Sequence, residues 1–356
     1  MSANNTSLAR RSRSGRWCLT VSATALAIAA LGNTAAEGMA HKAPDCFGKR
    51  ATIVGAGDIA GTPGNDVIVG SDGADVIDAA GGDDRICSLG SDDTLTGGLG
   101  NDSINAGAGD DAIAGDLRAL EDDLSGDGGN DLLLGGDGTD RITGDNRSIL
   151  GQVHGDGGND LIAGGDGVDS IIGDNGSTFA SAGGHGGNDL IGGGLGDDES
   201  AVGDNSGALI ASGTGGNDGI SGGPGDDSFL IGDHSAGEQA TGRAGKDAID
   251  GGAGDTTYLV GDHGSGGTVS GDGGNDLIRG GTGADAQIVG DHSPGFGTPV
   301  GRSGNDLLLG HSGDDNLHGD NLADIGAVDS GNGRDGCHGG AGVDTAANCE
   351  RLTGVP

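Results

Sequence analysis

Residues 129–140 read Gly129-Asn130-Asp131-Leu132-Leu133-Leu134-Gly135-Gly136-Asp137-Gly138-Thr139-Asp140, two Gly/Asp turns on either side of a short aliphatic run. The same arrangement begins at residues 61–69 and first returns every nine residues. So many turn residues exclude helix, and one aligned aliphatic residue per repeat predicts a very short strand. The aligned Asp of this first series are Asp66, Asp75, Asp84, Asp93, Asp102 and Asp111, each followed two positions later by Ile68, Ile77, Ile86, Leu95, Ile104 and Ile113.

Beyond Asp111 the chain follows a longer, 29-residue period, which divides into segments of nine, nine and eleven. The eleven-residue segment has weakly apolar centres at Ile149-Leu150, Leu209-Ile210 and Pro299-Val300, which predict a third short strand. The first Asp of each unit is Asp102, Asp131, Asp160, Asp189, Asp218, Asp247, Asp276, Asp306 or Asp335. The second is Asp140, Asp169, Asp198, Asp227, Asp285, Asp315 or Asp344, with Thr256 in place of one. A Gly-Asp-Asn or Gly-Asp-His turn closes the units at Asp145, Asp174, Asp204, Asp233, Asp262, Asp291 and Asp320.

The composition supports a repetitive fold. The 356 residues include 85 Gly but only four Phe, one Tyr and one Trp, too few large side chains for an ordinary enzyme core. Gly shows no three-residue period and there are only six Pro, which excludes collagen. The choice is therefore between disorder and a repeat protein.

The N-terminus has the pattern of an export signal. Arg10, Arg11, Arg13 and Arg16 precede an apolar run over residues 18–31 and small residues up to Ala36. The run is short and rich in Ala and Thr, which favours a cleaved signal peptide over residues 1–36 above a membrane anchor. The Arg10-Arg11 pair also permits twin-arginine export. We therefore expect a secreted, extracellular protein with no membrane span after cleavage.

The charge indicates a cationic partner. Asp and Glu number 55 against 17 Lys and Arg, and cleavage after residue 36 would change the formal charge from -38 to -42. Such a polyanion excludes nucleic acid and anionic membrane as partners and repels itself when compact. Four Cys would remain, and we favour two sequence-local disulfides, Cys46 with Cys87 and Cys337 with Cys349, closing the two ends of the repeats.

The segment at residues 129–140 resembles the GGxGxDxUx nonapeptide of RTX (haemolysin-type) calcium-binding proteins. The resemblance covers residues 61–346 and implies a right-handed parallel β-roll or β-solenoid whose Gly/Asp turns bind Ca²⁺. It makes the aligned Asp of both repeat series the calcium ligands. The eleven-residue segment and Thr256 depart from the family pattern.

Elementary chemistry points to the same metal. Gly lets carbonyl groups converge and Asp supplies short, hard oxygen ligands, a donor set suited to Ca²⁺. Stacked coils bring the carboxylates to about 4.8 Å from one another, so they repel unless a cation lies between them. Multiple Ca²⁺ ions should then supply much of the folding free energy. The alternative is that these Asp only form turns.

We expect residues 37–60 to form an N-terminal cap, 61–320 the calcium-binding solenoid and 321–356 a C-terminal cap. An 18-residue coil would make a two-sided roll, which we favour for residues 61–114. A 29-residue coil would make a three-sided prism, and beyond residue 114 both remain open. His234, His263 and His292 recur at the Gly-Asp-His turns, either as a transition-metal column or, as we favour, as left-handed turn formers that hydrogen-bond along the stack.

The favoured function is calcium binding by a non-enzymatic extracellular scaffold, with an unknown surface or matrix partner. A surface adhesin or ligand-binding solenoid is the alternative, and an accessory module of a secreted hydrolase is less favoured because no repeat-free segment is large enough for a catalytic domain. An ice- or polysaccharide-binding solenoid would require a ladder of Thr or aromatic residues recurring at nine or 29 positions, which we do not expect here.

Overall fold

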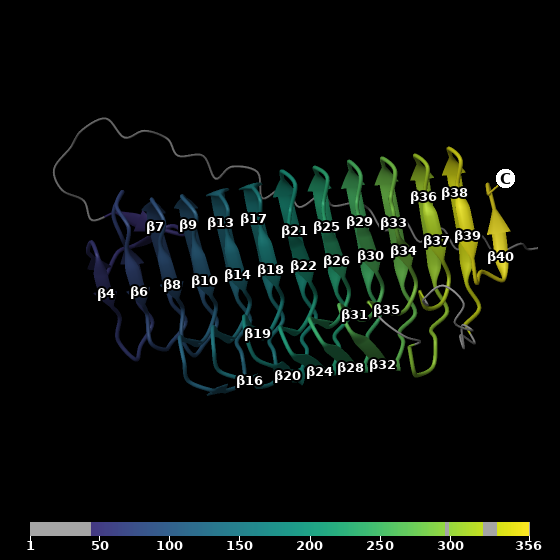
Figure 1. Cartoon of the computed structure of the whole chain (residues 1–356). Coiled ribbons are helices and arrows are strands. Elements are labelled where there is room, and N and C mark those ends of the chain that lie inside the picture. Colours follow the sequence, from purple (N-terminus) through teal and green to yellow (C-terminus); the bar gives the residue numbers. More distant parts are fainter. Residues whose placement is uncertain (1–43, 296–298, 323–332, 356) are drawn as a thin grey trace, which may run out of the picture. The chain divides into compact units, whose positions relative to one another are not determined.

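The computed structural model describes residues 44–295, 299–322 and 333–355. The signal peptide expected over residues 1–36 lies outside these ranges. All regular secondary structure in the described ranges is β-strand, mostly in stacked parallel ladders (Figure 1). No described segment is a helix long and apolar enough to cross a membrane. The prediction of an all-β parallel solenoid is confirmed.

One ladder contains the longer strands and is called the long-strand sheet. Its 13 strands pair in parallel, each with the corresponding strand of the next coil. Near its start, a two-stranded antiparallel hairpin, β1 (Asp45–Cys46) and β2 (Lys49–Arg50), precedes the first coil. The long-strand sheet contains β3 (Ile53–Val54), β5 (Val67–Val69), β7 (Arg85–Gly90), β9 (Ser103–Ala108), β13 (Leu132–Gly138), β17 (Leu161–Gly167), β21 (Leu190–Leu195), β25 (Gly219–Pro224), β29 (Ala248–Ala253), β33 (Leu277–Thr282), β36 (Leu307–Ser312), β38 (Gly336–Ala341) and β40 (Arg351–Thr353).

A second parallel ladder, the short-strand sheet, has 12 strands of two or three residues. Each of its strands follows a long strand after a Gly/Asp turn. It contains β4 (Asp58–Ala60), β6 (Val76–Asp78), β8 (Thr94–Thr96), β10 (Ala112–Ala114), β14 (Arg141–Thr143), β18 (Ser170–Ile172), β22 (Ser200–Val202), β26 (Phe229–Ile231), β30 (Tyr258–Val260), β34 (Ile288–Val289), β37 (Asn316–His318) and β39 (Thr345–Ala347).

Two further ladders, the first and second side sheets, arise from the eleven-residue segments. The first side sheet contains β11 (Arg118–Ala119), β15 (Arg147–Ser148), β19 (Gly176–Ser177), β23 (Ser206–Gly207), β27 (Ser235–Ala236), β31 (Gly264–Ser265) and β35 (Ser293–Pro294). The second side sheet contains β12 (Leu124–Ser125), β16 (Val153–His154), β20 (Ala182–His185), β24 (Ile210–Thr214), β28 (Gln239–Arg243) and β32 (Thr268–Asp272).

The strand register decides the coil length. Ile86 pairs with Ile104, which makes an 18-residue coil, whereas Ile104 pairs with Leu133, which makes a 29-residue coil. The early coils are thus the two-sided roll that the sequence favours over residues 61–114. The later coils repeat at about 29 residues, and the six coils from β9 to β32 have four strands each, so neither alternative of a two-sided or three-sided repeat describes them.

The expectation of one extra strand in the eleven-residue segment is wrong, because that segment forms two. Its proposed apolar centres are also wrong in part, since Leu150 and Leu209 are largely exposed. The buried position is instead one residue per strand of the second side sheet, which is Val153, Ala182, Ala211, Ala240 or Val269. The most apolar residues of the segment therefore did not mark its inward side.

The main core consists of two parallel rows of mostly aliphatic side chains, one from nearly every strand of the two main sheets. Ile86 and Leu95 are fully buried in an 18-residue coil, as are Ile104 and Ile113 in the first 29-residue coil. Burying a side chain of this size contributes about 1.5–3 kcal/mol relative to leaving it exposed. Even with a third buried side chain from Val202, Ile231, Val260 or Val289 in four of the coils, this is few for a 29-residue coil, which leaves the turns to supply much of the stability.

Close stacking of the turns explains the Gly content. Gly136 has φ +122°, and a Cβ placed on it would overlap the carbonyl of Gly107 in the neighbouring coil. A larger residue would therefore be strained and would also push the coils apart.

Disulfides join Cys46 to Cys87 and Cys337 to Cys349, with Cα atoms 5.8 and 5.9 Å apart. These are the pairs that the sequence favours. The first attaches the β1–β2 hairpin to β7, and the second attaches the chain between β39 and β40 to β38. Both lie at ends of the stack, where a terminal coil has a neighbour on one side only.

Candidate metal centre

The first Asp row lies where the chain enters each long strand. In each of these residues, carboxylate Oδ1 accepts the backbone N–H of the row member one coil before it, at 2.6 to 2.8 Å. The carboxylates are thereby held in register along the stack. The first Asp row consists of Asp66, Asp84, Asp102, Asp131, Asp160, Asp189, Asp218, Asp247, Asp276, Asp306 and Asp335, although Asp66 has no earlier member to bond.

The second Asp row lies at the opposite turns, before the short strands. The same ladder of N–H to Oδ1 hydrogen bonds runs through it at 2.7 to 3.2 Å. Thr256 takes one place: its N–H still donates to Asp285, but its buried hydroxyl has no partner. The second Asp row consists of Asp75, Asp93, Asp111, Asp140, Asp169, Asp198, Asp227, Asp285, Asp315 and Asp344.

The other carboxylate oxygen is the informative one. Oδ2 of Asp131, and likewise of Asp160 and Asp140, is buried and accepts no hydrogen bond. A Cβ placed on Gly115 would overlap both Asp131 Oδ2 and the carbonyl of Gly144, so this oxygen shares a small space with backbone oxygen from the next coil. A buried acceptor without a donor costs about 1–3 kcal/mol. The donor set, carboxylate plus backbone carbonyl, is the one that Ca²⁺ prefers.

The pKa values of the Asp in both rows express the same imbalance. Burial raises the pKa of Asp84 to about 6 and that of Asp102 to about 8. Burial, together with the carboxylates of Asp160 and Asp116, raises the pKa of Asp131 to about 10. In the second row, burial raises the pKa of Asp140 to about 6. Ionised rows are therefore unfavourable unless a cation compensates them.

Side chains alone do not enclose an ion. Within the described ranges, no three His, Cys, Asp or Glu side chains converge as a preformed set. An ion at either row would therefore take part of its coordination from backbone carbonyls of the Gly-rich turns, as the resemblance implies.

A third Asp row is present that the sequence analysis recognised as a turn but not as part of a site. In the 18-residue coils, one continuous turn leads from Gly97 to Asp102. In the 29-residue coils, eleven extra residues are inserted into that turn. Its first half still stacks on the coil before, Gly115 against Gly97, and its second half resumes where Gly129 stacks against Gly100. The third Asp row consists of Asp116, Asp145, Asp174, Asp204, Asp233, Asp262, Asp291 and Asp320.

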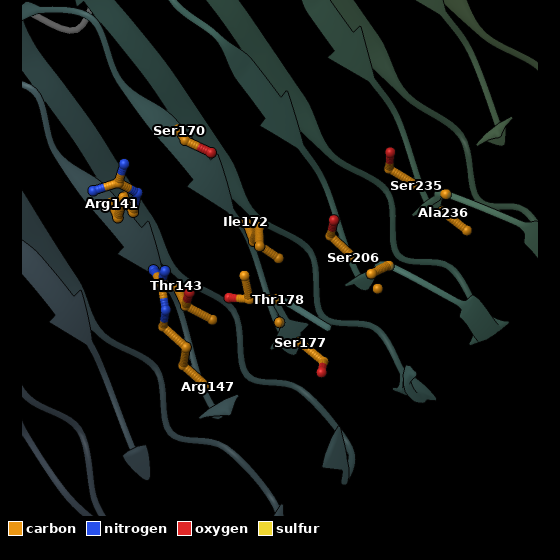
Figure 2. Close-up of a pocket in the computed structure, with 14 residues that line it drawn as sticks. Arg141, Thr143, Arg147, Ser170, Ile172, Ser177, Thr178, Ser206, Ser235 and Ala236 are labelled. Carbon is orange, nitrogen blue, oxygen red and sulfur yellow. The ribbon is translucent and has the colours of Figure 1, made fainter. Parts of the chain in front are cut away.

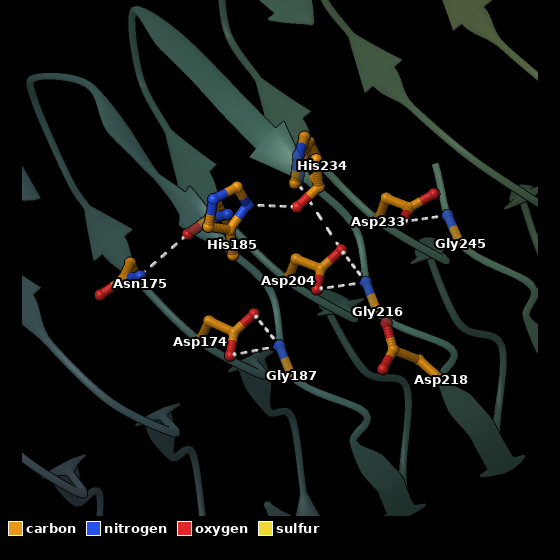
Figure 3. Close-up of polar contacts among 12 residues, drawn as sticks. Asp174, Asn175, His185, Gly187, Asp204, Gly216, Asp218, Asp233, His234 and Gly245 are labelled. Carbon is orange, nitrogen blue, oxygen red and sulfur yellow. Dashed lines mark hydrogen bonds and ion pairs between the residues drawn. The ribbon is translucent and has the colours of Figure 1, made fainter. Parts of the chain in front are cut away.

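The third row reconnects the two halves of the split turn. Carboxylates of Asp174, Asp204 and Asp233 accept the N–H groups of Gly187, Gly216 and Gly245 (Figure 3). This places two buried carboxylates per coil at one edge instead of one. Burial and then the charge of Asp160 raise the pKa of Asp145 well above its usual range. The repetition of Gly-Asp at 29-residue intervals was the signal that could have identified it.

The residues after these Asp are an Asn ladder and three stacked His. Asn146 Nδ2 donates to Asn175 Oδ1 at 3.0 Å, which confirms hydrogen bonding along the stack. Rings of His234, His263 and His292 lie parallel with centroids 4.9 and 5.0 Å apart. None of these Asn or His residues has a positive φ, so the expected left-handed turn conformation is wrong. Burial lowers the pKa of His234 to about 4, so this imidazole is neutral at pH 7.

A groove runs between the short-strand sheet and the first side sheet. Two adjoining cavities of about 380 and 450 Å³ share Ser206, Ser235 and Ala236 in their lining (Figure 2). At one end of the groove are Arg141 and Arg147.

The other end of the groove carries Phe229 and Tyr258, whose rings stack at 5.2 Å. These two aromatic residues are 29 positions apart, but they form a single pair and not the ladder of Thr or aromatic residues that an ice- or polysaccharide-binding solenoid would require.

The stacked Asp rows define a class of protein, the parallel β-solenoid with acidic turns at its edges. The family model of the RTX calcium-binding nonapeptide repeat matches more than half of the chain, and the chain belongs to this family. The matched residues are 55–86, 88–117, 119–146, 152–179, 210–230, 239–258, 264–286 and 300–325. No curated protein matches the chain.

Proposed function

We propose that this chain is a secreted, non-enzymatic scaffold whose solenoid is folded and stabilised by Ca²⁺ bound along the first and second Asp rows. The observation that carries the proposal is the unpartnered Oδ2 of the row carboxylates between Asp84 and Asp315, repeated coil after coil beside Gly carbonyls. Each Oδ1 is already committed to the ladder, so Oδ2 is the oxygen available to an ion. Family membership supports calcium as that ion.

Calcium would act by removing the repulsion that the fold creates. Row members of neighbouring coils lie about one inter-strand spacing apart, and the carboxylates of Asp160 and Asp102 help to raise the pKa of Asp131 between them. A divalent ion between two coils compensates both carboxylates and ties the coils together. Ion binding and coil stacking are then one equilibrium, so the metal-free chain at neutral pH should be largely unfolded.

Secretion is supported by the two disulfides and by the N-terminal signal pattern. Disulfides persist in oxidising compartments, where free Ca²⁺ also reaches millimolar concentrations suited to weak sites. A non-enzymatic role is supported by the continuous coil repeat through the matched region.

The test is a Ca²⁺ titration of the oxidised chain lacking residues 1–36, followed by far-ultraviolet circular dichroism. We expect a cooperative transition from coil to β-structure with Ca²⁺ that Mg²⁺ does not reproduce. A control is Asp160→Asn, which keeps the Oδ1 acceptor of the ladder and replaces only the ion-facing oxygen. A circular dichroism spectrum of β-structure that persists in a chelator at pH 8 would contradict the proposal.

A second candidate function, binding of a carboxylated polysaccharide in the groove, rests on an unpaired Arg stack. Arg118, Arg141 and Arg147 occupy neighbouring coils, and no described carboxylate forms an ion pair with them. Burial, then Arg118 and Arg141, lowers the pKa of Arg147 to about 10. In so acidic a chain, an unpaired cluster of like charge favours an anionic ligand over a neutral one.

Affinity electrophoresis through gels containing hyaluronate, in Ca²⁺, would test this second function. We expect retardation that Arg147→Gln reduces, with neutral dextran as the control polymer. Equal mobility in both gels would exclude it.

A further inference from the structure

Three successive coils replace the Asn of the third turn by His, and the two kinds of coil satisfy their polar atoms differently. In the Asn coils, each amide donates to the next, at 3.0 Å from Asn146 to Asn175 and at 3.1 Å from Asn175 to Asn205. The His coils have no such ladder, because stacked imidazole rings present their faces to one another. Any hydrogen-bond partner of their ring nitrogens must therefore lie in the plane of the ring, beside the stack.

In His292 the partner on one side of the ring is a backbone carbonyl. Nε2 of His292 lies 3.3 Å from the carbonyl oxygen of Gly271, an acceptor only. Nε2 must then carry the hydrogen, and Nδ1 of the neutral ring has a lone pair. Within the described residues Nδ1 of all three His has no hydrogen-bond partner, and Nε2 of His234 and His263 has none either, so a contact assigns the hydrogen to Nε2 only in His292. All three side chains are at most 1% exposed.

The lone pair faces a carboxylate of the preceding coil. Nδ1 lies 3.8 Å from Asp204 Oδ2 in His234 and 3.6 Å from Asp262 Oδ2 in His292. Asp262 Oδ2 is itself buried without a partner. At His292 two buried acceptors therefore face each other, which is unfavourable unless something electropositive lies between them. Asp204 Oδ2, which faces His234, also accepts the N–H of Gly216 at 3.3 Å.

The separation distinguishes a proton from a metal ion. A hydrogen bond between these atoms would require about 2.7–3.2 Å. Two ligands of one tetrahedral ion, each bonded at about 2.0–2.2 Å, lie about 3.4 Å apart, close to the separations observed. Water would need a larger space and additional polar partners.

We propose that the Gly-Asp-His turns form transition-metal sites, in which His Nδ1 and the carboxylate of the preceding third-row Asp bind one Zn²⁺-type ion. The pairs are His234 with Asp204 and His292 with Asp262. Imidazole nitrogen with carboxylate oxygen suits Zn²⁺, Ni²⁺ or Cu²⁺ rather than Ca²⁺. Water or backbone carbonyls complete the coordination, since no third side chain of the usual ligand types is preformed in the described ranges. Because the pairs are buried, the ion enters as the coils assemble.

The test uses Co²⁺ as a spectroscopic stand-in for Zn²⁺. The oxidised chain, recovered from an exporting host, is unfolded with a chelator, refolded in Ca²⁺ with Co²⁺, and desalted. We expect at least one retained equivalent of Co²⁺, with the visible absorption of a nitrogen-ligated ion. The triple variant His234→Asn, His263→Asn and His292→Asn should retain none, yet it should fold, because it installs the ladder residue of the other coils.

A control replaces the exposed His154 and His185 by Asn and should retain Co²⁺ like the parent chain. Equal retention by the triple variant would overturn the proposal, as would no retention by the parent chain. Circular dichroism in Ca²⁺ alone, recorded on every sample, separates failure of this site from failure of calcium-dependent folding.

Discussion

The 18-residue coils and the 29-residue coils form the turn before each long strand, where the first Asp row lies, in two different ways. In the former, the six residues from Gly97 to Asp102 form one continuous turn with a single carboxylate. In the latter, eleven extra residues split the turn, and Asp145 or its third-row equivalent reconnects it through the N–H of a Gly such as Gly158. The comparison teaches that an insertion can be accommodated within a turn when a side chain replaces the lost backbone contact.

The replacement changes the electrostatics of that edge. Burial raises the pKa of Asp84 to about 6 among the 18-residue coils, whereas burial and neighbouring carboxylates raise that of Asp131 to about 10 in the 29-residue coils. The later coils therefore contain more charge that needs compensation. We expect them to depend on Ca²⁺ more strongly than the first coils do.

The largest expected effect is that of pH on the metal-free chain. The folded-state pKa values of buried row carboxyls such as Asp84 and Asp131 lie above the unfolded value of about 3.9, so folding favours the protonated form of these groups. Stability from this source is fully present below about pH 4 and is lost as pH rises through about 6, for Asp84, to about 10, for Asp131. In a chelator, circular dichroism should show substantial β-structure at pH 4.5 and little at pH 8. More β-structure at pH 8 than at pH 4.5 would contradict the predicted fall in stability with rising pH.

Next in size is the loss of one ion-facing oxygen. Asp160→Asn, in a 29-residue coil, should raise the Ca²⁺ midpoint of folding about tenfold, equivalent to about 1.4 kcal/mol. Asp84→Asn, in an 18-residue coil, should raise it by less than about threefold. Both variants keep the Oδ1 ladder, and calcium titrations of the two side by side give the ratio. Equal midpoints would remove the proposed difference between the regions.

A smaller effect is expected from the third row in saturating Ca²⁺. Asp174→Ala leaves the buried N–H of Gly187 without its acceptor and should lower the free energy of unfolding by about 1–3 kcal/mol. Asp174→Asn retains an acceptor and should lose less. Urea denaturation measures both, and no difference between Ala and Asn would show that the split turn closes without this hydrogen bond.

The smallest expected effect is a gain in calcium affinity. Thr256→Asp fills the interruption in the second Asp row and supplies the oxygen that the buried Thr hydroxyl does not. We expect a modest decrease in the Ca²⁺ midpoint, about twofold, and a greater bound stoichiometry by isothermal titration calorimetry. Thr256→Asn is the matched control, and a decrease of the same size in that variant would show that charge is not involved.

The sequence predicts the main sheets well because their signal is local and repeated. Ile68, Ile77 and Ile86 each follow a turn Asp by two positions, and all three are buried in the core. The eleven-residue segment was predicted poorly because its inward position is not uniformly apolar: it varies between Val, as at Val153, and Ala, as at Ala182, which has no more hydrophobic signature than a loop residue. Its exposed Leu150 is more apolar but lies outside.

The first two Asp rows could be placed in register from spacing alone, whereas their surroundings could not. For example, the hydrogen bond from the N–H of Gly158 to the carboxylate of Asp145 depends on how the split turn closes in space. The acceptor pair of His292 and Asp262 likewise depends on the stacking of neighbouring coils. Linear spacing predicts which residues align but not which atoms are left without partners.

Anomalous X-ray diffraction from crystals grown in Ca²⁺ would test the central claim most directly. We predict calcium peaks along the first and second Asp rows, each about 2.3–2.6 Å from an Asp Oδ2 and from Gly carbonyl oxygens of a neighbouring coil. The peak beside Thr256 should be weak or missing. Ordered water at the Oδ2 atoms, with no anomalous peak along either row, would contradict the account.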